Sequence, residues 1–440
     1  MIDNSEQLSI CDNVVATGGG AAALTFVSPD EAIIVTTRAE FSGRTAPREF
    51  SVQHVDQPRL GKTAAGFERF SGEDMFALYP ELKAARDGKG ALERANAKSA
   101  ERGTRWIREA RPGFELRDRQ LSQAATLTLM HNTKPGEGLL SWTRLAVRTP
   151  DELGVAAYSA SPFEAANTVK DAARLYGAAL VGVAPMNELY VSQRVSGKAV
   201  LFEDVEAPVV TDEKFVIPRR MKWVVVLGIP MDVDLLARAP SAVADAACGF
   251  AHSKLAFTVS TLSEFIRGLG YQAIPSVNET AQFVPFAMDA GLGELSRMNK
   301  LITPEFGSAL RLCTVFTDLP MTYDKPIDFG LADYCKQCTA CAEACPAGAL
   351  SFDTEPSFQI RGPWNNAGHE AWFEDSYRCF AYWQASGTAC AVCVASCPFT
   401  RKSAARPSQA DPANDRYFKS IDSADRPQKA APWWVADSPE

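Results

Sequence analysis

The sequence lacks a hydrophobic stretch that could cross a bilayer, because no run approaches the roughly 20 apolar residues that a spanning helix needs. It also lacks a basic surplus: 45 Lys and Arg stand against 53 Asp and Glu, for a net charge of −8. Such an acidic chain has no general electrostatic attraction to nucleic acid or to an anionic membrane surface. Disorder is excluded too, since 46% of the 440 residues are hydrophobic, and this length suggests two or three domains.

A recognisable export signal is also missing from these residues. The uncharged run from Asn13 to Pro29 has the composition of the apolar part of such a signal, but no Lys or Arg precedes it. No pair of arginines occurs before Arg219-Arg220. Two alternatives stay open: the signal is absent from this sequence, or the protein has none.

Cysteine is scarce outside one segment of the chain. Of the eleven cysteines, eight lie between Cys335 and Cys397, and only Cys11, Cys248 and Cys313 lie elsewhere. Disulfide scaffolds are typical of small secreted chains, whereas crowding of this kind in a large chain favours metal ligation.

The first half of this segment has the spacing of a bacterial ferredoxin. It reads Cys335-x2-Cys338-x2-Cys341-x3-Cys345-Pro346. In this pattern three cysteines hold one [4Fe–4S] cluster and the fourth ligates the other cluster. The motif therefore predicts a domain with two clusters.

The second half repeats the ferredoxin ending after a stretched first spacer. It reads Cys379-x10-Cys390-x2-Cys393-x3-Cys397-Pro398. The crossed arrangement predicts one cluster on Cys335, Cys338, Cys341 and Cys397, and the other on Cys379, Cys390, Cys393 and Cys345. Two structural zinc sites are the alternative, but zinc prefers isolated Cys-x2-Cys pairs, so the spacing favours iron.

Four regions are expected along the chain: an N-terminal unit over residues 1–150 that packs on the core, a core over 151–325, a ferredoxin-like domain over 326–405 and a tail over 406–440. The tail is rich in Pro, Ala and Asp. In the core, helical patterns alternate with buried strands, which predicts an α/β or α+β fold.

The clearest expected element is a helix from Ser161 to Tyr176, with Ser161 as its N-cap and Gly177 at its end. Residues 72–112 have a charged helical pattern, whereas turn residues and aromatics dominate around 112–148. The other expected elements are a helix opening at Asp151-Glu152, strands at 178–183 and 221–227, a helix from His252 to Leu269 and a strand at 271–274.

Short motifs follow one another through the core. They include Leu269-Gly270-Tyr271-x-Ala273-Ile274-Pro275-x2-Asn278, Ala290-Gly291-Leu292-Gly293-Glu294-x2-Arg297, Leu301-Ile302-Thr303-Pro304-Glu305-x-Gly307, Thr317-Asp318-Leu319-Pro320, Asp324-Lys325-Pro326-Ile327-Asp328 and Cys379-x3-Trp383. The order and the residues of these motifs resemble those of the corrinoid-dependent reductive dehalogenases of organohalide-respiring bacteria. The resemblance is good over roughly 150–400 and loose before it, where it depends on Glu68-Arg69-Phe70.

The resemblance implies an α+β fold in which a nitroreductase-like core binds a corrinoid base-off and a ferredoxin-like 2[4Fe–4S] domain feeds it electrons. None of the four histidines (His54, His131, His252 and His369) lies in an Asp-x-His-x2-Gly setting, so the motif of histidine-ligated cobalamin is absent. The cofactors expected are two [4Fe–4S] clusters and a cobalamin-type corrinoid.

Candidate cofactor contacts are Gly291, Leu292 and Gly293 in one motif, and Thr303 and Pro304 in the next. Glycine lets the backbone approach a large flat ligand closely. A plain turn is the alternative explanation for these glycines.

In the family, a Tyr thought to protonate the product is supported by an Asn and an Arg, and the matching residues here are His252, Asn278 and Arg311. The Tyr is thus a His. A protonated imidazole can donate a proton, although a neighbouring Arg311 disfavours that form. The alternative is that His252 is structural and the proton has another source.

Aromatic residues between two cluster ligands, Tyr382 and Trp383, are expected to line the substrate pocket, because aromatic walls suit apolar organohalides. Ordinary packing is the alternative. Trp106, Trp142 and Tyr158 are weaker candidates for the same wall.

The function implied is reductive dehalogenation of a small apolar organohalide with electrons from an external donor. The resemblance also implies the outer face of the cytoplasmic membrane and a small membrane anchor protein as partner, with the cytoplasm as the alternative. An epoxyqueuosine reductase-like enzyme is a rival, but a tRNA ligand calls for a basic surface. A non-catalytic iron–sulfur or corrinoid electron carrier is the other alternative, and nucleic acid is not expected as a partner.

Overall fold

The computed structural model describes residues 52–400, apart from residues 71, 129–133 and 278. The expectations for residues 1–51 and for the tail over 406–440 lie outside the described residues. Within the described part of the chain, no helix is both long enough and apolar enough to span a membrane.

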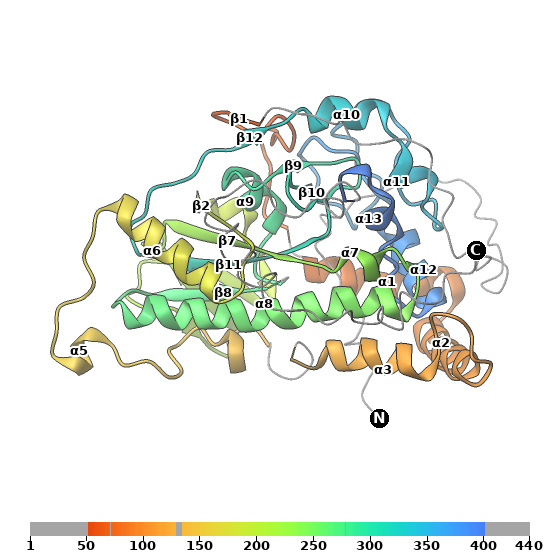
Figure 1. Cartoon of the computed structure of the whole chain (residues 1–440), viewed down its shortest axis with the longest axis horizontal. Coiled ribbons are helices and arrows are strands. Elements are labelled where there is room, and N and C mark those ends of the chain that lie inside the picture. The colour runs from red at the N-terminus through yellow and green to blue at the C-terminus, as the bar shows by residue number, and fades with distance from the viewer. Residues whose placement is uncertain (1–51, 71, 129–133, 278, 401–440) are drawn as a thin grey trace, which may run out of the picture.

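A four-stranded antiparallel sheet forms the centre of the molecule (Figure 1). Its strands lie in the order β2 (Leu180–Pro185), β7 (Trp223–Pro230), β11 (Leu310–Thr317) and β8 (Ala273–Ser276). The helices α6 (Pro162–Leu175) and α8 (Ala242–Gly268) pack on one face, and α9 (Phe283–Asp289) packs on the other.

The strand β7 shows how this sheet is buried on both faces. Val224 and Val226 belong to the hydrophobic core shared with α9, whereas Val225 and Leu227 belong to the core shared with α8. Successive side chains of a strand point to opposite faces, so both sets are fully buried. This is why the strand is continuously apolar in sequence instead of alternating.

The sequence predicted α6 closely, because its signals are local. The Ser161 hydroxyl accepts the N–H of Glu164, the Glu164 carboxylate accepts the N–H of Ser161, and Pro162 occupies the first turn. The expected strands and the short helix α5 (Pro150–Leu153) are also confirmed, each shifted by a few residues at most.

The long helix α8 was predicted too short by ten residues at its start. It begins after Ser241, whose hydroxyl accepts the N–H of Ala244, instead of at His252. Its first turns are rich in Ala and Gly, which weakens the apolar periodicity. These small residues have a packing role, since a Cβ at Gly249 would collide with the side chain of Thr126.

The N-terminal unit consists of helices that pack against the core and the cysteine-rich region. They are α1 (Gly72–Asp87), α2 (Ala91–Arg108) and α3 (Leu116–Ala125), followed by the 3-10 turn η2 (Gly138–Leu140). The helix α3 packs along α8, and α2 packs on α12. The helix α3 lies in a region where the sequence indicated mainly turns, and Glu115 and Asp118 form its capping box.

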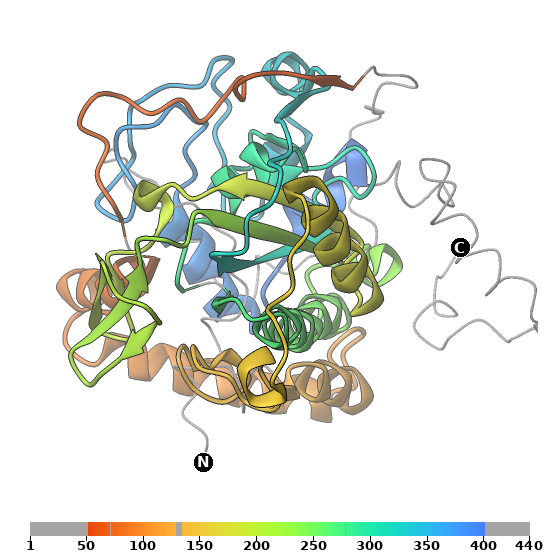
Figure 2. The ribbon, with the colours of Figure 1, turned by 90° about the vertical axis from the view of Figure 1, so that its left-hand side faces the viewer.

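A second, smaller sheet lies beside the central sheet (Figure 2). Its strands have the order β3 (Arg194–Val195), β4 (Lys198–Glu203), β6 (Lys214–Pro218) and β5 (Val209–Val210), and the turn η3 (Glu188–Tyr190) precedes it. The strands β4 and β6 are parallel.

The cysteine-rich region follows a short ladder between β1 (Gln53–His54) and β12 (Ile327–Asp328). It contains the short helices α10 (Leu331–Gln337), α11 (Ala340–Glu343), α12 (Ser376–Ser386) and α13 (Val392–Ser396). The helix α13 contacts both α11 and α7 (Val233–Leu236), and a hairpin of β9 (Glu294–Leu295) and β10 (Leu301–Ile302) reaches α10 from the core. The fold is therefore mixed helix and sheet, with the cysteines at one end of the central sheet (Figure 1).

Candidate functional site

Four cysteines from three separate segments form what we call the first thiol group. Cys335 lies in α10, Cys338 ends that helix, Cys341 lies in α11 and Cys397 follows α13. Burial, together with the nearby thiols of Cys397 and Cys338, raises the pKa of the Cys335 thiol to about 12. Cys341 likewise interacts with Cys397, Cys335 and Cys338.

The other four cysteines form the second thiol group: Cys345, Cys379, Cys390 and Cys393. The pKa of the Cys379 thiol is raised by burial first and then by Glu374 and the other three cysteines of the group. Cys341 and Cys393 also interact, so the two groups are neighbours. The fourth cysteine of each sequence motif thus lies with the opposite group, in the crossed order expected from the spacing.

Buried thiols of both groups are disfavoured as thiolates. Burial raises the pKa of the Cys393 thiol to about 12 and that of Cys397 to about 11. Among the described residues, no three His, Cys, Asp or Glu side chains are arranged to hold a single metal ion. The charge of an iron–sulfur cluster would stabilise the thiolate form that ligates it.

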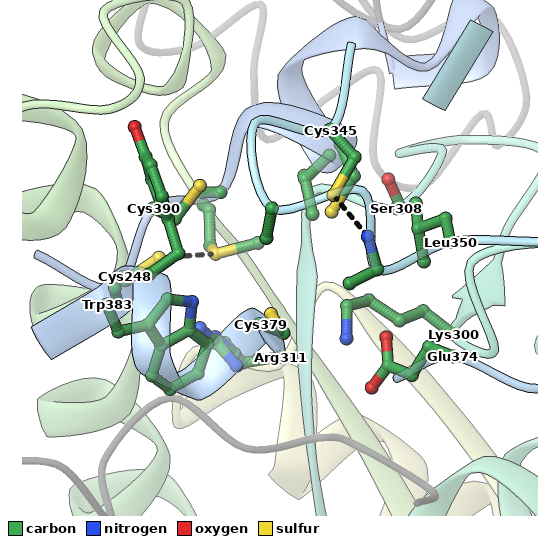
Figure 3. A pocket seen from close by; sticks show the side chains of 18 of the residues that line it. Cys248, Lys300, Ser308, Arg311, Cys345, Leu350, Glu374, Cys379, Trp383 and Cys390 are labelled. Carbon is green, nitrogen blue, oxygen red and sulfur yellow. Dashed lines mark hydrogen bonds between the residues drawn. The ribbon is translucent and has the colours of Figure 1, made fainter. Parts of the chain in front are cut away.

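A cavity of about 940 Å³ adjoins the second thiol group. All four of its cysteines line this cavity, and Figure 3 shows Cys345, Cys379 and Cys390 around it. The opposite walls come from α8 through Cys248 and from β11 through Arg311. The cavity therefore lies between the sheet, its long helix and the cysteine-rich region.

The lining is mostly apolar, with a few charged side chains that sequence reasoning did not single out. Lys300 and Glu374 lie close together in it (Figure 3), and the Lys300 charge lowers the pKa of Glu374, which burial raises. Ser308 also lines the cavity. Lys300 follows the motif ending at Arg297 and Glu374 lies five residues before Cys379, but neither belongs to a recognisable ligand pattern.

Both aromatic residues expected at the substrate pocket lie in α12 and line this cavity. Tyr382 and Trp383 are 8% and 7% exposed, and Trp383 lies beside Arg311 in Figure 3. Two weaker candidates lie elsewhere: Trp106 packs on Phe114 and Trp142 packs on Phe215. Tyr158 is engaged at α6, where its hydroxyl is 3.1 Å from the Thr168 hydroxyl.

The three expected catalytic residues have different surroundings. Arg311 lines the cavity from β11, in antiparallel register with Ile229 of β7. His252 is fully buried in α8, and its Nδ1 is 3.2 Å from the carbonyl oxygen of Cys248, which itself lines the cavity. Asn278 lies outside the described residues.

The glycines expected at a cofactor pack against the protein's own backbone. A Cβ at Gly291 would collide with the carbonyl oxygen of Lys325, and one at Gly293 would collide with that of Ile302. Leu292 belongs to the core shared with α9. These glycines therefore already have a structural reason that involves no ligand.

The second pair of expected cofactor contacts, Thr303 and Pro304, lies in a tight turn. The Thr303 hydroxyl accepts the N–H of Phe306, and its backbone N–H donates to Gly307. Neither residue lines the cavity. Their role as cofactor contacts stays a prediction.

The arrangement of the cysteines defines the class of protein. Eight cysteines in two adjacent groups are typical of a two-cluster iron–sulfur protein, and the family model of a 4Fe-4S double cluster binding domain matches residues 334–400. The model of a reductive dehalogenase subunit matches residues 189–321, which contain β7, α8 and β11. Over these residues the chain is therefore similar to reductive dehalogenases.

Individual reductive dehalogenases are also similar to this chain over part of their length. A tetrachloroethene reductive dehalogenase of Sulfurospirillum multivorans is 42% identical over 256 residues, which are 54% of this chain and 51% of that protein. One of Dehalobacter restrictus is 32% identical over 295 residues, 60% of this chain and 53% of its own length. The chain thus spans about half the length of the curated relatives it matches.

The solved structure of the catabolic reductive dehalogenase NpRdhA has the same fold. It superimposes with a TM-score of 0.56 at 22% identity, over 84% of this chain and 46% of that one. An epoxyqueuosine reductase of Bacillus cereus is 44% identical, but over only 61 residues, or 14% of this chain. The sequence similarity to that relative therefore covers a short segment.

Proposed function

We propose that this protein is a reductive dehalogenase that replaces the halogen of a small organohalide with hydrogen. One observation supports this most strongly: a large, mostly apolar cavity has four cluster cysteines on one wall and Arg311 and Trp383 on the others. The cluster held by the second thiol group would pass its electrons directly to a cofactor in this cavity. A ferredoxin has no need of such a chamber.

The cavity fits a corrinoid, the cofactor in the B12-dependent mechanism suggested by one solved relative. Cluster cysteines and aromatic side chains line the cavity, and no described histidine does. This agrees with a corrinoid bound base-off, without a histidine ligand, in a nitroreductase-like core. When bound, the corrinoid would supply the cobalt centre at which the carbon–halogen bond is cleaved.

The protein's own residues would orient the substrate and control charge. Trp383 and Tyr382 would contact the apolar, polarisable substrate, and the Arg311 guanidinium would stabilise negative charge that develops as halide leaves. His252, with Asn278 and Arg311 in support, would provide the proton. The reaction consumes one organohalide, two electrons and one proton, and releases the reduced product and one halide ion.

The proposed order of electron transfer follows from the neighbouring thiol groups. Electrons from an external donor would reach the first thiol group, pass to the second and then enter the cavity. Because two relatives carry tetrachloroethene in their names, chlorinated ethenes are the first substrates to test. By the same family relation we propose a location at the outer face of the cytoplasmic membrane and a small membrane anchor as partner.

The test is halide release by the reconstituted holoprotein. Protein loaded with iron, sulfide and a cobamide would be incubated with reduced viologen and a panel of organohalides, with iron and cobalt measured on the same sample. We expect about eight irons and one cobalt per chain, and halide released in proportion to viologen oxidised. Cobalt reduction without halide release from any substrate would support an electron carrier and contradict the enzyme.

A further inference from the structure

A buried arginine in the turn between β9 and β10 is bound to the loop that carries the first thiol group. Arg297 is 1% exposed. Its Nε donates to the carbonyl oxygens of Cys335 and Cys338 at 3.0 and 2.9 Å, and its Nη2 donates to that of Cys335 at 2.6 Å. Its Nη1 donates to the carbonyls of Ser351 and Asp353 at 2.9 and 2.6 Å.

These contacts leave the charge of the guanidinium largely unneutralised. Every acceptor named above is a backbone carbonyl, not a carboxylate, and the ring of Trp372 packs on the guanidinium with its centroid 5.1 Å away. A buried cation thus lies beside two cysteines of the first thiol group.

Glu294, three residues before Arg297, binds the start of helix α10, whereas Arg297 binds its end. Its carboxylate accepts the N–H groups of Phe329 and Leu331 at 2.7 and 3.3 Å, at the start of α10. Arg297 binds carbonyls at the end of α10, so the acidic group lies at the positive end of the helix and the basic group at the negative end. This pair explains the spacing Glu294-x2-Arg297 without any contact to the cavity.

We propose that Arg297 is a positioning residue that raises the reduction potential of the cluster held by the first thiol group. A cluster gains one electron when it is reduced, and no bond is formed or broken. A nearby buried cation stabilises the more negative, reduced form. The inference rests on the two-cluster domain and not on dehalogenation, so it can be tested without an organohalide.

The same turn presents a different cation to the second thiol group. Lys300 lines the cavity together with Cys393. The Lys300 ammonium also interacts electrostatically with Glu374, which lies beside it (Figure 3). Arg297 and Lys300 are therefore expected to act on different clusters, although only two residues separate them.

The experiment is a dithionite titration of the holoprotein followed by electron paramagnetic resonance, with iron content measured for every sample. In Arg297→Gln we expect one of the two cluster potentials to fall by about 59 mV, which is a tenfold change in the one-electron equilibrium constant. The equilibrium constant of the other cluster should change less than twofold. Lys300→Gln should move the other potential. Arg267→Gln removes a buried guanidinium at the far end of α8, and should move neither.

Two results would overturn the proposal: full iron content in Arg297→Gln with both potentials unchanged, or the same cluster shifted by the Arg297 and Lys300 variants. If Arg297→Gln is isolated with less than full iron, Arg297→Lys decides the matter. Lys keeps the charge but loses the planar fork. An equilibrium constant of cluster reduction within about threefold of the wild-type value supports the proposal. A tenfold fall in that constant with full iron contradicts it.

Discussion

The two thiol groups have the same chemistry but different surroundings. Cys335, Cys341 and Cys397 of the first group are buried in the hydrophobic core, and α10 is held at both ends by the hairpin from the core. The four cysteines of the second group are partly exposed, and all four line the cavity. Three of the four cysteines of the first group are enclosed by protein and Cys338 is partly exposed, whereas the second group faces a space that a cofactor could fill.

This difference indicates a division of labour along an electron path. A cluster that is surrounded by backbone can have its potential set by fixed charges such as Arg297. A cluster that borders a cavity can pass an electron to whatever occupies the cavity. Three experiments would test whether the two clusters differ in this way.

The largest effect is expected from Cys345→Ala. Because Cys345 lies with the second group despite belonging to the first motif, this variant should lose the same cluster as Cys379→Ala. Iron should fall from about eight to about four per chain, and halide release should stop. The remaining cluster signal should be the same in these two variants.

The matched control is Cys397→Ala, which should lose the other cluster and leave a different signal. If Cys345→Ala instead left the signal that Cys397→Ala leaves, the crossed ligation would be wrong. The contrast between an enclosed and an open cluster would then have to be assigned again.

A smaller effect is expected from His252→Phe, which tests the cavity end of the path. If His252 donates the proton as proposed, its removal should lower turnover about a hundredfold, which is within the usual range for a general acid. Iron and cobalt content should stay at wild-type values, because His252 contacts the backbone of its own helix through Nδ1. Wild-type turnover with full cofactor content would remove His252 from the mechanism.

The smallest effect concerns the enclosed end, where Glu294 is buried. Burial raises the pKa of this carboxyl to about 7, although two N–H donors oppose the shift. A raised pKa means that the folded protein binds the proton more tightly, so stability is lost as pH rises between about 4.5 and 7. Wild-type protein should therefore have a lower Tm at pH 7.5 than at pH 5 from this group.

Glu294→Gln should reduce that pH dependence by roughly 3 kcal/mol at most, since each pKa unit corresponds to about 1.4 kcal/mol. Thermal unfolding of both proteins at the two pH values is the measurement. Equal pH dependence in the variant would show that Glu294 does not titrate as a buried group.

Local signals allowed much of the fold to be predicted, and packing decided the rest. The N-cap at Ser161 and the apolar run of β7 are readable because the residues that cause them are adjacent in sequence. The start of α8 and the helix α3 were missed, because the small residues that let these helices pack together weaken the periodic pattern. For Gly291 and Gly293 the sequence left a ligand contact and a plain turn open, because it does not show which backbone carbonyls they approach.

The sequence by itself determined the eight cysteines and their grouping, since ligand spacing around a cluster is a short-range property of the chain. Only the tertiary structure showed that Cys248, Arg311 and Trp383, from α8, β11 and α12, line one cavity with the second thiol group. Only it showed that Arg297 binds the first thiol group's loop. The partners of Arg297 are backbone carbonyls, which every residue carries, so no sequence pattern can reveal them.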